Sequence, residues 1–69
     1  MKFLKHVDEF NGEVSYQVLK KEKSNWVDGY IHYKNRWKNW YFLPVSHSFS
    51  GEHMVKIANF MSKLDDPKL

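Results

Sequence analysis

Residues 26–44 read WVDGYIHYKNRWKNWYFLP and contain all three tryptophans and three of the four tyrosines. Residues 26–33 and residues 40–45, which extend one residue beyond this stretch, carry large apolar or aromatic side chains at both alternating positions. Residues 34–39 between them are polar apart from one tryptophan, which is typical of a turn. The stretch therefore predicts a β-hairpin with large side chains on both of its faces.

Residues 14–20 read VSYQVLK and alternate largely between apolar and polar side chains, which predicts a half-buried strand. Asn11-Gly12 precedes this strand and is a strong signal for a turn with a left-handed backbone. Residues 20–25, KKEKSN, contain no apolar side chain. We expect them to form a solvated strand end and a turn.

Residues 3–10 fit two different structures. Phe3, Val7 and Phe10 lie at helical spacing, and Gly12 could then end that helix in the left-handed region. Alternatively, the same residues form the first strand of a hairpin whose turn contains Gly12. The turn signal and the alternating segment after it favour the hairpin, and both alternatives stay open.

A helix is predicted from Ser50 to about Leu64. Ser50 is a suitable N-cap, and Glu52 lies in the first turn, where the helix dipole favours an acidic side chain. The apolar stripe expected to face the sheet recurs at spacings of three and four and consists of Met54, Ile57, Ala58, Met61 and Leu64. Asp65-Asp66-Pro67 is a stop signal.

These elements predict one α+β domain over residues 1–69, with a small antiparallel sheet of three or four strands packed on one C-terminal helix. The chain has no cysteine, which excludes both disulfides and a thiolate zinc site as sources of stability. A helix of about 14 residues spans ~21 Å, enough to cover one face of a small sheet. The other face must then meet water, a second copy or a partner.

The chain carries 11 basic and 8 acidic residues, a net charge of +3. This mild excess permits an anionic partner and is weaker than the charge of a dedicated nucleic-acid binder. The first ten residues, MKFLKHVDEF, contain charges throughout and no long apolar run. We therefore expect neither a signal peptide nor a membrane span here, and a reducing, cytosolic setting.

The sequence offers little for catalysis, and we predict no enzyme and no cofactor. Four histidines are the only side chains that titrate near neutrality, and no nucleophile motif accompanies them. A metal site built from His47, Glu52 and His53 matches no regular zinc spacing. We expect these histidines to be solvated or to cap the helix, and no metal to bind.

The aromatic hairpin is the remaining candidate for a partner-binding site. We expect four of its rings to lie side by side on one face: Trp26, Tyr30, Trp40 and Phe42. We expect the turn to add one ring and three cations at the end of this face: Lys34, Arg36, Trp37 and Lys38. Rings beside Arg and Lys suit a protein interface, and they also suit stacking on single-stranded bases. A structural alternative is that the rings simply fill the core.

The leading prediction is a small non-enzymatic module that docks this face and turn onto a protein partner, with self-association as a further expectation. The alternative is a binder of single-stranded DNA or RNA that stacks bases on its rings and pairs its cations with phosphates. The short, cysteine-free composition, rich in lysine and asparagine, resembles that of small bacteriophage accessory proteins. Many of those bind one host protein, which would imply an accessory or inhibitor role.

Overall fold

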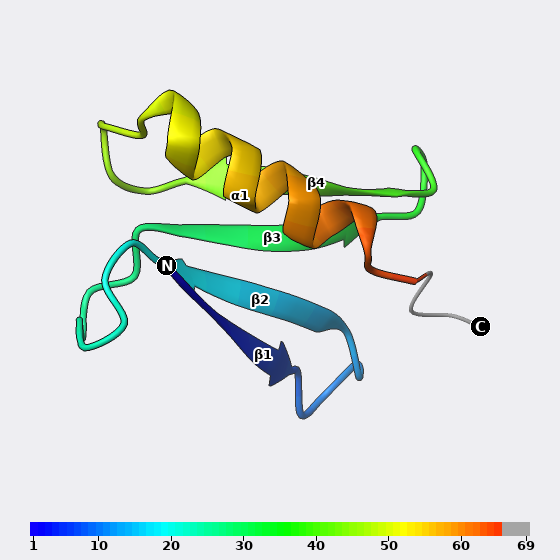
Figure 1. Ribbon diagram of the computed structural model, residues 1–69. Helices are drawn as coiled ribbons and strands as arrows, with labels where there is room; N and C mark the ends of the chain where they lie inside the picture. The colour runs from blue at the N-terminus through cyan, green and yellow to red at the C-terminus, as the bar shows by residue number, and fades with distance from the viewer. Residues whose placement is uncertain (66–69) are drawn as a thin grey trace.

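The protein folds into a four-stranded antiparallel sheet with a single helix across one face (Figure 1). The computed structural model describes residues 1–65. The elements are β1 (Lys2–Val7), β2 (Val14–Leu19), β3 (Gly29–Lys34), β4 (Asn39–Pro44) and α1 (Gly51–Ser62). Each strand pairs with the next one in chain order. The predicted α+β class with one C-terminal helix is confirmed, and the sheet has four strands.

The N-terminal element is a strand, as the hairpin alternative predicted. β1 pairs with β2 over its whole length, from Lys2 opposite Leu19 to Val7 opposite Val14. The helical spacing in this segment arises because Phe3 and Val7 lie on the same face of the strand, which both periodicities allow. Pairing with β2 decides between them, because the backbone groups of β1 that point towards β2 find hydrogen-bond partners there.

Asp8 organises the turn between β1 and β2. Its carboxylate accepts hydrogen bonds from the backbone N–H groups of Phe10, at 2.8 Å, and Asn11, at 3.1 Å. Its backbone N–H donates to the carbonyl of Glu13, and the N–H of Gly12 donates to the Asp8 carbonyl. Gly12 has a φ of 71°, the left-handed conformation that the Asn-Gly pair predicted. The turn between Val7 and Val14 is longer than a two-residue loop, and the Asp8 side chain stabilises it.

The core lies between the sheet and the helix. Its centre consists of Val18, Ile31, Trp40 and Ile57, all buried. Each such side chain contributes ~1.5–3 kcal/mol when it leaves water. The rings of Phe3 and Phe60 stack with their centroids 4.0 Å apart, and this pair joins β1 to α1. In a short chain without disulfides, these ring contacts supply much of the buried apolar area.

The register of β3 and β4 corrects one prediction. Trp40 lies opposite Tyr33 and Phe42 lies opposite Ile31, so both rings face the helix. Tyr30 lies on the other face of the sheet. The expectation that Trp40 and Phe42 share a face with Tyr30 is therefore wrong. The reason is the four-residue connection between Lys34 and Asn39, which pairs even-numbered residues of β3 with odd-numbered residues of β4.

The helix begins where the sequence predicts. The Ser50 side chain accepts a hydrogen bond from the His53 N–H, and Nδ1 of His53 accepts one from the Ser50 N–H, which completes a capping box. The last helical residue is Ser62, two residues before the expected end. Asp66 and Pro67 of the expected stop signal lie outside the described residues. Within residues 1–65 no helix has the length and hydrophobicity needed to cross a lipid bilayer.

The buried stripe of α1 is rotated from the predicted one. Ile57 is buried as expected, but Met54 is 45% exposed and Ala58 is exposed. Phe60, which lies outside the five-residue stripe, packs edge-on against Tyr16 with centroids 5.1 Å apart. We attribute the rotation to the size of Phe60, whose ring buries more area against the sheet than Met54 or Ala58 could.

Asp28 determines where β3 begins. Its buried carboxylate accepts a hydrogen bond from the Lys20 N–H at 2.8 Å, and its own N–H donates to the Val18 carbonyl. Its carbonyl accepts from the N–H groups of Val45 and Ser46. These bonds join the end of β2 to the residues after β4. The strand therefore starts at Gly29 and not at residue 26, where the alternation predicted it.

Gly29 allows β3 to pack closely against β4. A side-chain carbon at this position would lie 2.5 Å from the Phe42 ring and 2.9 Å from the Leu43 carbonyl oxygen. The ring of Phe42 thus occupies the space that any other residue would need.

Lys20 makes specific side-chain contacts, whereas the sequence predicts a solvated strand end at this position. Its ammonium group donates to the Ser46 hydroxyl at 2.8 Å and to the Ser48 carbonyl. It also lies 4.4 Å from the centroid of the Phe49 ring. Lys20 therefore attaches the segment between β4 and α1 to the end of β2.

Candidate docking surface on the open sheet face

The face of the sheet opposite α1 is covered by no other element of the described chain (Figure 1). We call it the open face. Its side chains come from alternate positions of all four strands and include Leu4, His6, Ser15, Gln17, Tyr30, His32, Lys34, Tyr41 and Leu43. These residues combine rings, aliphatic groups and hydrogen-bonding groups, a composition suited to recognition.

A run of four rings crosses the β3–β4 half of this face. The centroids of Tyr30 and His32 are 6.0 Å apart, and those of His32 and Tyr41 are also 6.0 Å apart. Tyr41 then meets Trp37 edge-on at 5.8 Å. Because each ring contacts the next, the run forms one continuous aromatic surface from β3 to the turn before β4.

Lys34 fixes Trp37 against the open face. The Lys34 ammonium group lies 4.2 Å from the centroid of the Trp37 ring and 5.9 Å from that of Tyr41. Cation–π contacts of this kind contribute ~0.5–2 kcal/mol. Trp37 nevertheless remains 60% exposed, and Arg36 and Lys38 beside it are exposed. The 34–39 turn thus carries three cationic side chains and one large ring that is accessible to a partner.

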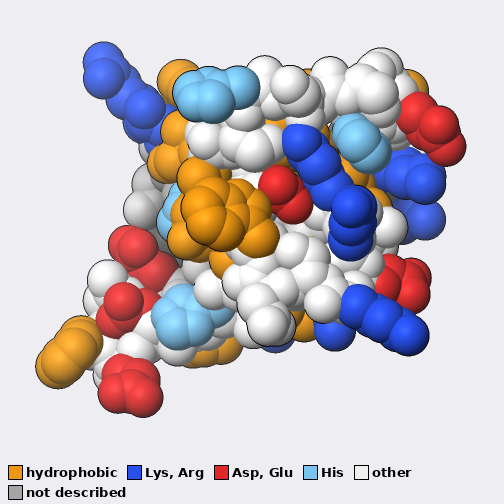
Figure 2. All heavy atoms as spheres, turned by 90° about the vertical axis from the view of Figure 1, so that its left-hand side faces the viewer, with side chains coloured by type: hydrophobic (Ala, Val, Ile, Leu, Met, Phe, Trp, Pro, Cys, Tyr) orange, Lys and Arg blue, Asp and Glu red, His pale blue; other side chains and the backbone are white. Residues whose placement is uncertain are grey.

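The turn between β1 and β2 lies at the same end of the sheet and carries the opposite charge. Its acidic residues are Asp8, Glu9 and Glu13. The backbone N–H groups of Phe10 and Asn11 lower the pKa of Asp8, so its carboxylate is anionic at neutral pH. Figure 2 shows acidic side chains gathered at the lower left of the view.

The β1–β2 half of the open face is hollow where the β3–β4 half carries rings. A depression of about 330 Å³ lies over β2, with Tyr30 and His32 along one side. Its remaining lining comes from His6, Asp8, Glu13, Ser15 and Gln17. Ser15 and Gln17 are short or flexible, which leaves the space unfilled. The border of the depression at the turn is acidic.

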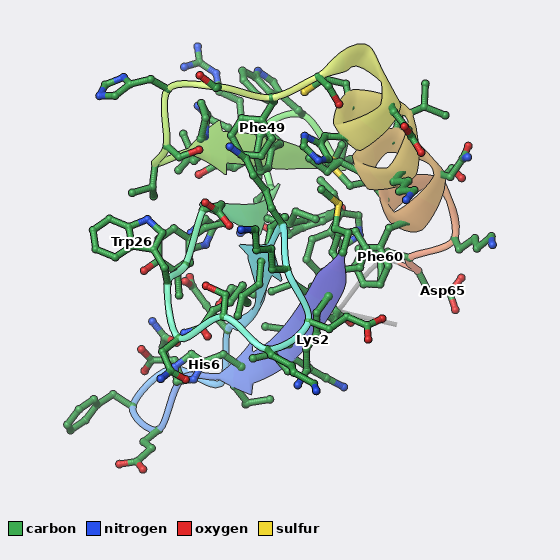
Figure 3. The ribbon with its side chains drawn as sticks, turned by 60° about the vertical axis from the view of Figure 1, so that its left-hand side comes forward. Lys2, His6, Trp26, Phe49, Phe60 and Asp65 are labelled. Atoms are coloured by element: carbon green, nitrogen blue, oxygen red, sulfur yellow. The ribbon has the colours of Figure 1, made fainter. Side chains whose placement is uncertain are left out.

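Trp26 adds a second exposed indole on the same side of the molecule. It belongs to the loop between β2 and β3, and its backbone N–H donates to the Ser24 hydroxyl at 2.9 Å. In Figure 3 Trp26 and His6 both point away from the helix, on the side opposite Phe60. Its indole is 67% exposed.

The predicted site residues therefore separate into two groups. The structure places Tyr30, Lys34 and Trp37 together on the open face, with Trp26 on the same side. Arg36 and Lys38 lie exposed in the adjacent turn. Whether these residues bind a partner stays a prediction.

Trp40 and Phe42 belong to the core instead of the docking surface. Trp40 is 9% exposed, and its indole N–H donates to the Asp65 carbonyl at 3.2 Å. Phe42 packs edge-on against Phe49 with centroids 5.1 Å apart. The rings on the open face that the prediction missed are His32 and Tyr41. Their shared face follows from the β3–β4 register, which the sequence alone does not specify.

Two of the three residues considered for a metal site have other roles. Nδ1 of His53 accepts the Ser50 hydrogen bond, and the Glu52 carboxylate lies 3.7 Å from the Lys56 ammonium group. Residues 1–65 contain no group of three or more His, Asp or Glu side chains placed to hold a metal ion. No protein-family model, curated protein or solved structure matches the chain. The geometry of the open face is therefore the basis for a proposed function.

Proposed function

We propose that this protein is a non-enzymatic binding module that docks its open face onto a protein. One observation carries the proposal: α1 covers one face of the sheet, while the other carries a continuous run of rings that ends in the exposed Trp37. The accessory or inhibitor role and the cytosolic setting expected from composition stay predictions.

The chemistry of the open face supports a protein partner. Trp and Tyr bury a large area while few torsions are restricted, and they dominate the binding free energy of protein interfaces. Around these rings the open face offers hydrogen-bonding groups from His6, Ser15 and Gln17. An aromatic centre with a polar border is the usual anatomy of a protein interface.

The test is capture of a partner with matched variants. Wild-type protein, Trp37→Ala and the control Val55→Ala are each used as bait, and retained proteins are quantified by mass spectrometry. Val55 is exposed on α1, so its truncation should leave retention unchanged. We expect at least a tenfold loss for Trp37→Ala, as for an anchor residue whose truncation costs ≥ ~1.4 kcal/mol. If wild type retains a protein and both variants retain it equally, docking of that protein through this face is refuted.

A second candidate, binding of single-stranded nucleic acid, has one observation in its favour. Lys34 lies over Trp37, and Arg36 and Lys38 occupy the same turn, so a stacked base and its phosphates could be bound together. Titration with oligonucleotides would then quench tryptophan fluorescence, and the affinity would fall steeply as salt is added. Unchanged fluorescence at low salt would eliminate this candidate.

A further inference from the structure

The two halves of the open face have complementary shapes and charges. The β3–β4 half is raised by the rings of Tyr30, His32 and Tyr41 and ends at the basic turn with Trp37. The β1–β2 half contains the depression of about 330 Å³ and ends at the acidic turn. Each half therefore has the features that would fit the other half of an identical molecule.

We infer that the protein docked on the open face is a second copy of this chain, related by a twofold axis that runs parallel to the strands between β2 and β3. This inference rests on the proposed docking function and names its partner. In the resulting dimer the rings of each protomer enter the depression of the other. The interface is isologous, since both protomers use the same surface.

The direction of the axis follows from the topology. A rotation about an axis parallel to the strands places β1 over β4 of the second copy and β2 over β3. The turns of both copies then lie at the same end of the dimer. The acidic turn of each copy faces the basic turn of the other, which gives two such contacts. An axis across the strands would instead place depression over depression and bring both turns onto the 20–28 loop of the other copy.

Charge favours the first arrangement. Glu9 and Glu13 on one turn would lie opposite Arg36 and Lys38 on the other, and such pairing steers association and selects one orientation. The acidic turn also carries Phe10, which is 98% exposed. In this dimer each turn brings an exposed ring to the other, Phe10 from one side and Trp37 from the other.

The size of the molecule is compatible with a small interface. The two longer extents of its Cα positions are 31 and 23 Å, which limits the projected area of the face and its turns to at most on the order of 700 Å², near the lower end of the roughly 600–1,000 Å² that each partner contributes to a standard interface. Packing of two sheets face to face with their strands nearly aligned is a common arrangement.

The test is a charge exchange between the two turns, with dissociation constants measured by analytical ultracentrifugation. One variant is Glu9→Lys with Glu13→Lys, and the other is Arg36→Glu with Lys38→Glu. Asp8 and Lys34 are left intact because they stabilise their turns. We expect each variant alone to dimerise at least tenfold more weakly than wild type. An equimolar mixture should form a heterodimer with affinity close to that of wild type, because both turn contacts become attractive again.

A matched control distinguishes the two axes. Lys21→Glu with Lys23→Glu makes the same change in net charge as the basic-turn variant, but in the 20–28 loop. An axis along the strands places the two 20–28 loops opposite each other, whereas an axis across the strands places each loop opposite a turn of the other copy. Mixed with the acidic-turn variant, the loop variant should therefore restore affinity only if the axis runs across the strands. Circular dichroism of every variant verifies that it is folded.

Three results would overturn the inference. They are a wild type that stays monomeric at millimolar concentration, turn variants that dimerise as wild type does, and a mixture that does not recover affinity. A monomer that retains another protein through Trp37 excludes the second copy and leaves the docking function intact. A monomer that retains no protein excludes both the dimer and the docking function. Quenching of its tryptophan fluorescence by oligonucleotides would then assign the open face to nucleic acid.

Discussion

Single residues join distant parts of this small chain, and Asp28 joins the most. Its side chain and backbone make four hydrogen bonds, to the end of β2 and to the residues that follow β4. The carboxylate is buried, so its partner, the N–H of Lys20, depends on it. A buried donor that loses its acceptor destabilises a protein by about 1–3 kcal/mol.

We predict that Asp28→Ala lowers the free energy of unfolding by about 1–3 kcal/mol, measured by urea denaturation. Asp28→Asn is the matched comparison, because its amide oxygen can still accept the hydrogen bond from Lys20. We expect Asn to cost less than half as much as Ala. Two variants of equal stability would show that the bond to Lys20 contributes nothing.

Asp8 gives stability a dependence on pH. The backbone N–H groups of Phe10 and Asn11, and to a lesser extent His6, hold the pKa of its carboxylate below the usual 3.8. A group with a lower pKa in the folded state stabilises the fold above its unfolded pKa, and this contribution is lost as the pH falls through the folded pKa.

We therefore predict that wild type is more stable than Asp8→Asn at neutral pH and that the difference shrinks as the pH falls below about 4. Thermal denaturation of both proteins from neutral to acidic pH measures the difference. Asn preserves an acceptor for the two backbone N–H groups, so the comparison isolates the charge. A difference that is constant over this range would contradict the prediction.

The stability of the helix depends on the hydrogen bonds of its first turn. The Ser50 side chain satisfies the His53 N–H, which has no partner within the helix. We predict that Ser50→Ala destabilises the protein by about 0.5–2 kcal/mol. Ser48→Ala, two residues earlier and outside the cap, should change stability by less than about 0.5 kcal/mol. Chemical denaturation of the two variants is the measurement, and equal effects would exclude a specific role for the cap.

Trp37 and Trp40 contribute differently to the stability of the whole molecule. Trp40 is part of the core, whereas Trp37 lies on the open face. We predict that Trp40→Ala costs about 3–5 kcal/mol, enough to unfold most of a chain this short. Trp37→Ala should cost no more than about 2 kcal/mol, the contribution of its cation–π contact with Lys34, measured by circular dichroism at protein concentrations where monomers predominate. A large loss of stability for Trp37→Ala would mean that its ring serves the fold more than binding.

Local signals in the sequence were enough to predict the elements. The Asn11-Gly12 pair located the first turn, alternation identified the strands, and Ser50 marked the start of the helix, because backbone preference and capping act over a few residues. The same signals placed the start of β3 too early. Alternation through Trp26 cannot reveal that Asp28 bonds to segments far away in the chain.

By itself, the sequence determined the α+β class, the approximate positions of three strands and one helix, and a surplus of rings over what one helix can cover, while residues 3–10 stayed open between strand and helix. Only the tertiary structure decided which rings are exposed, because one residue of register moves every side chain of a strand to the opposite face. That choice buried Trp40 and Phe42 and left Tyr41 and His32 beside Trp37. The two turns of opposite charge also meet at one end of the sheet only because the strands pair in chain order.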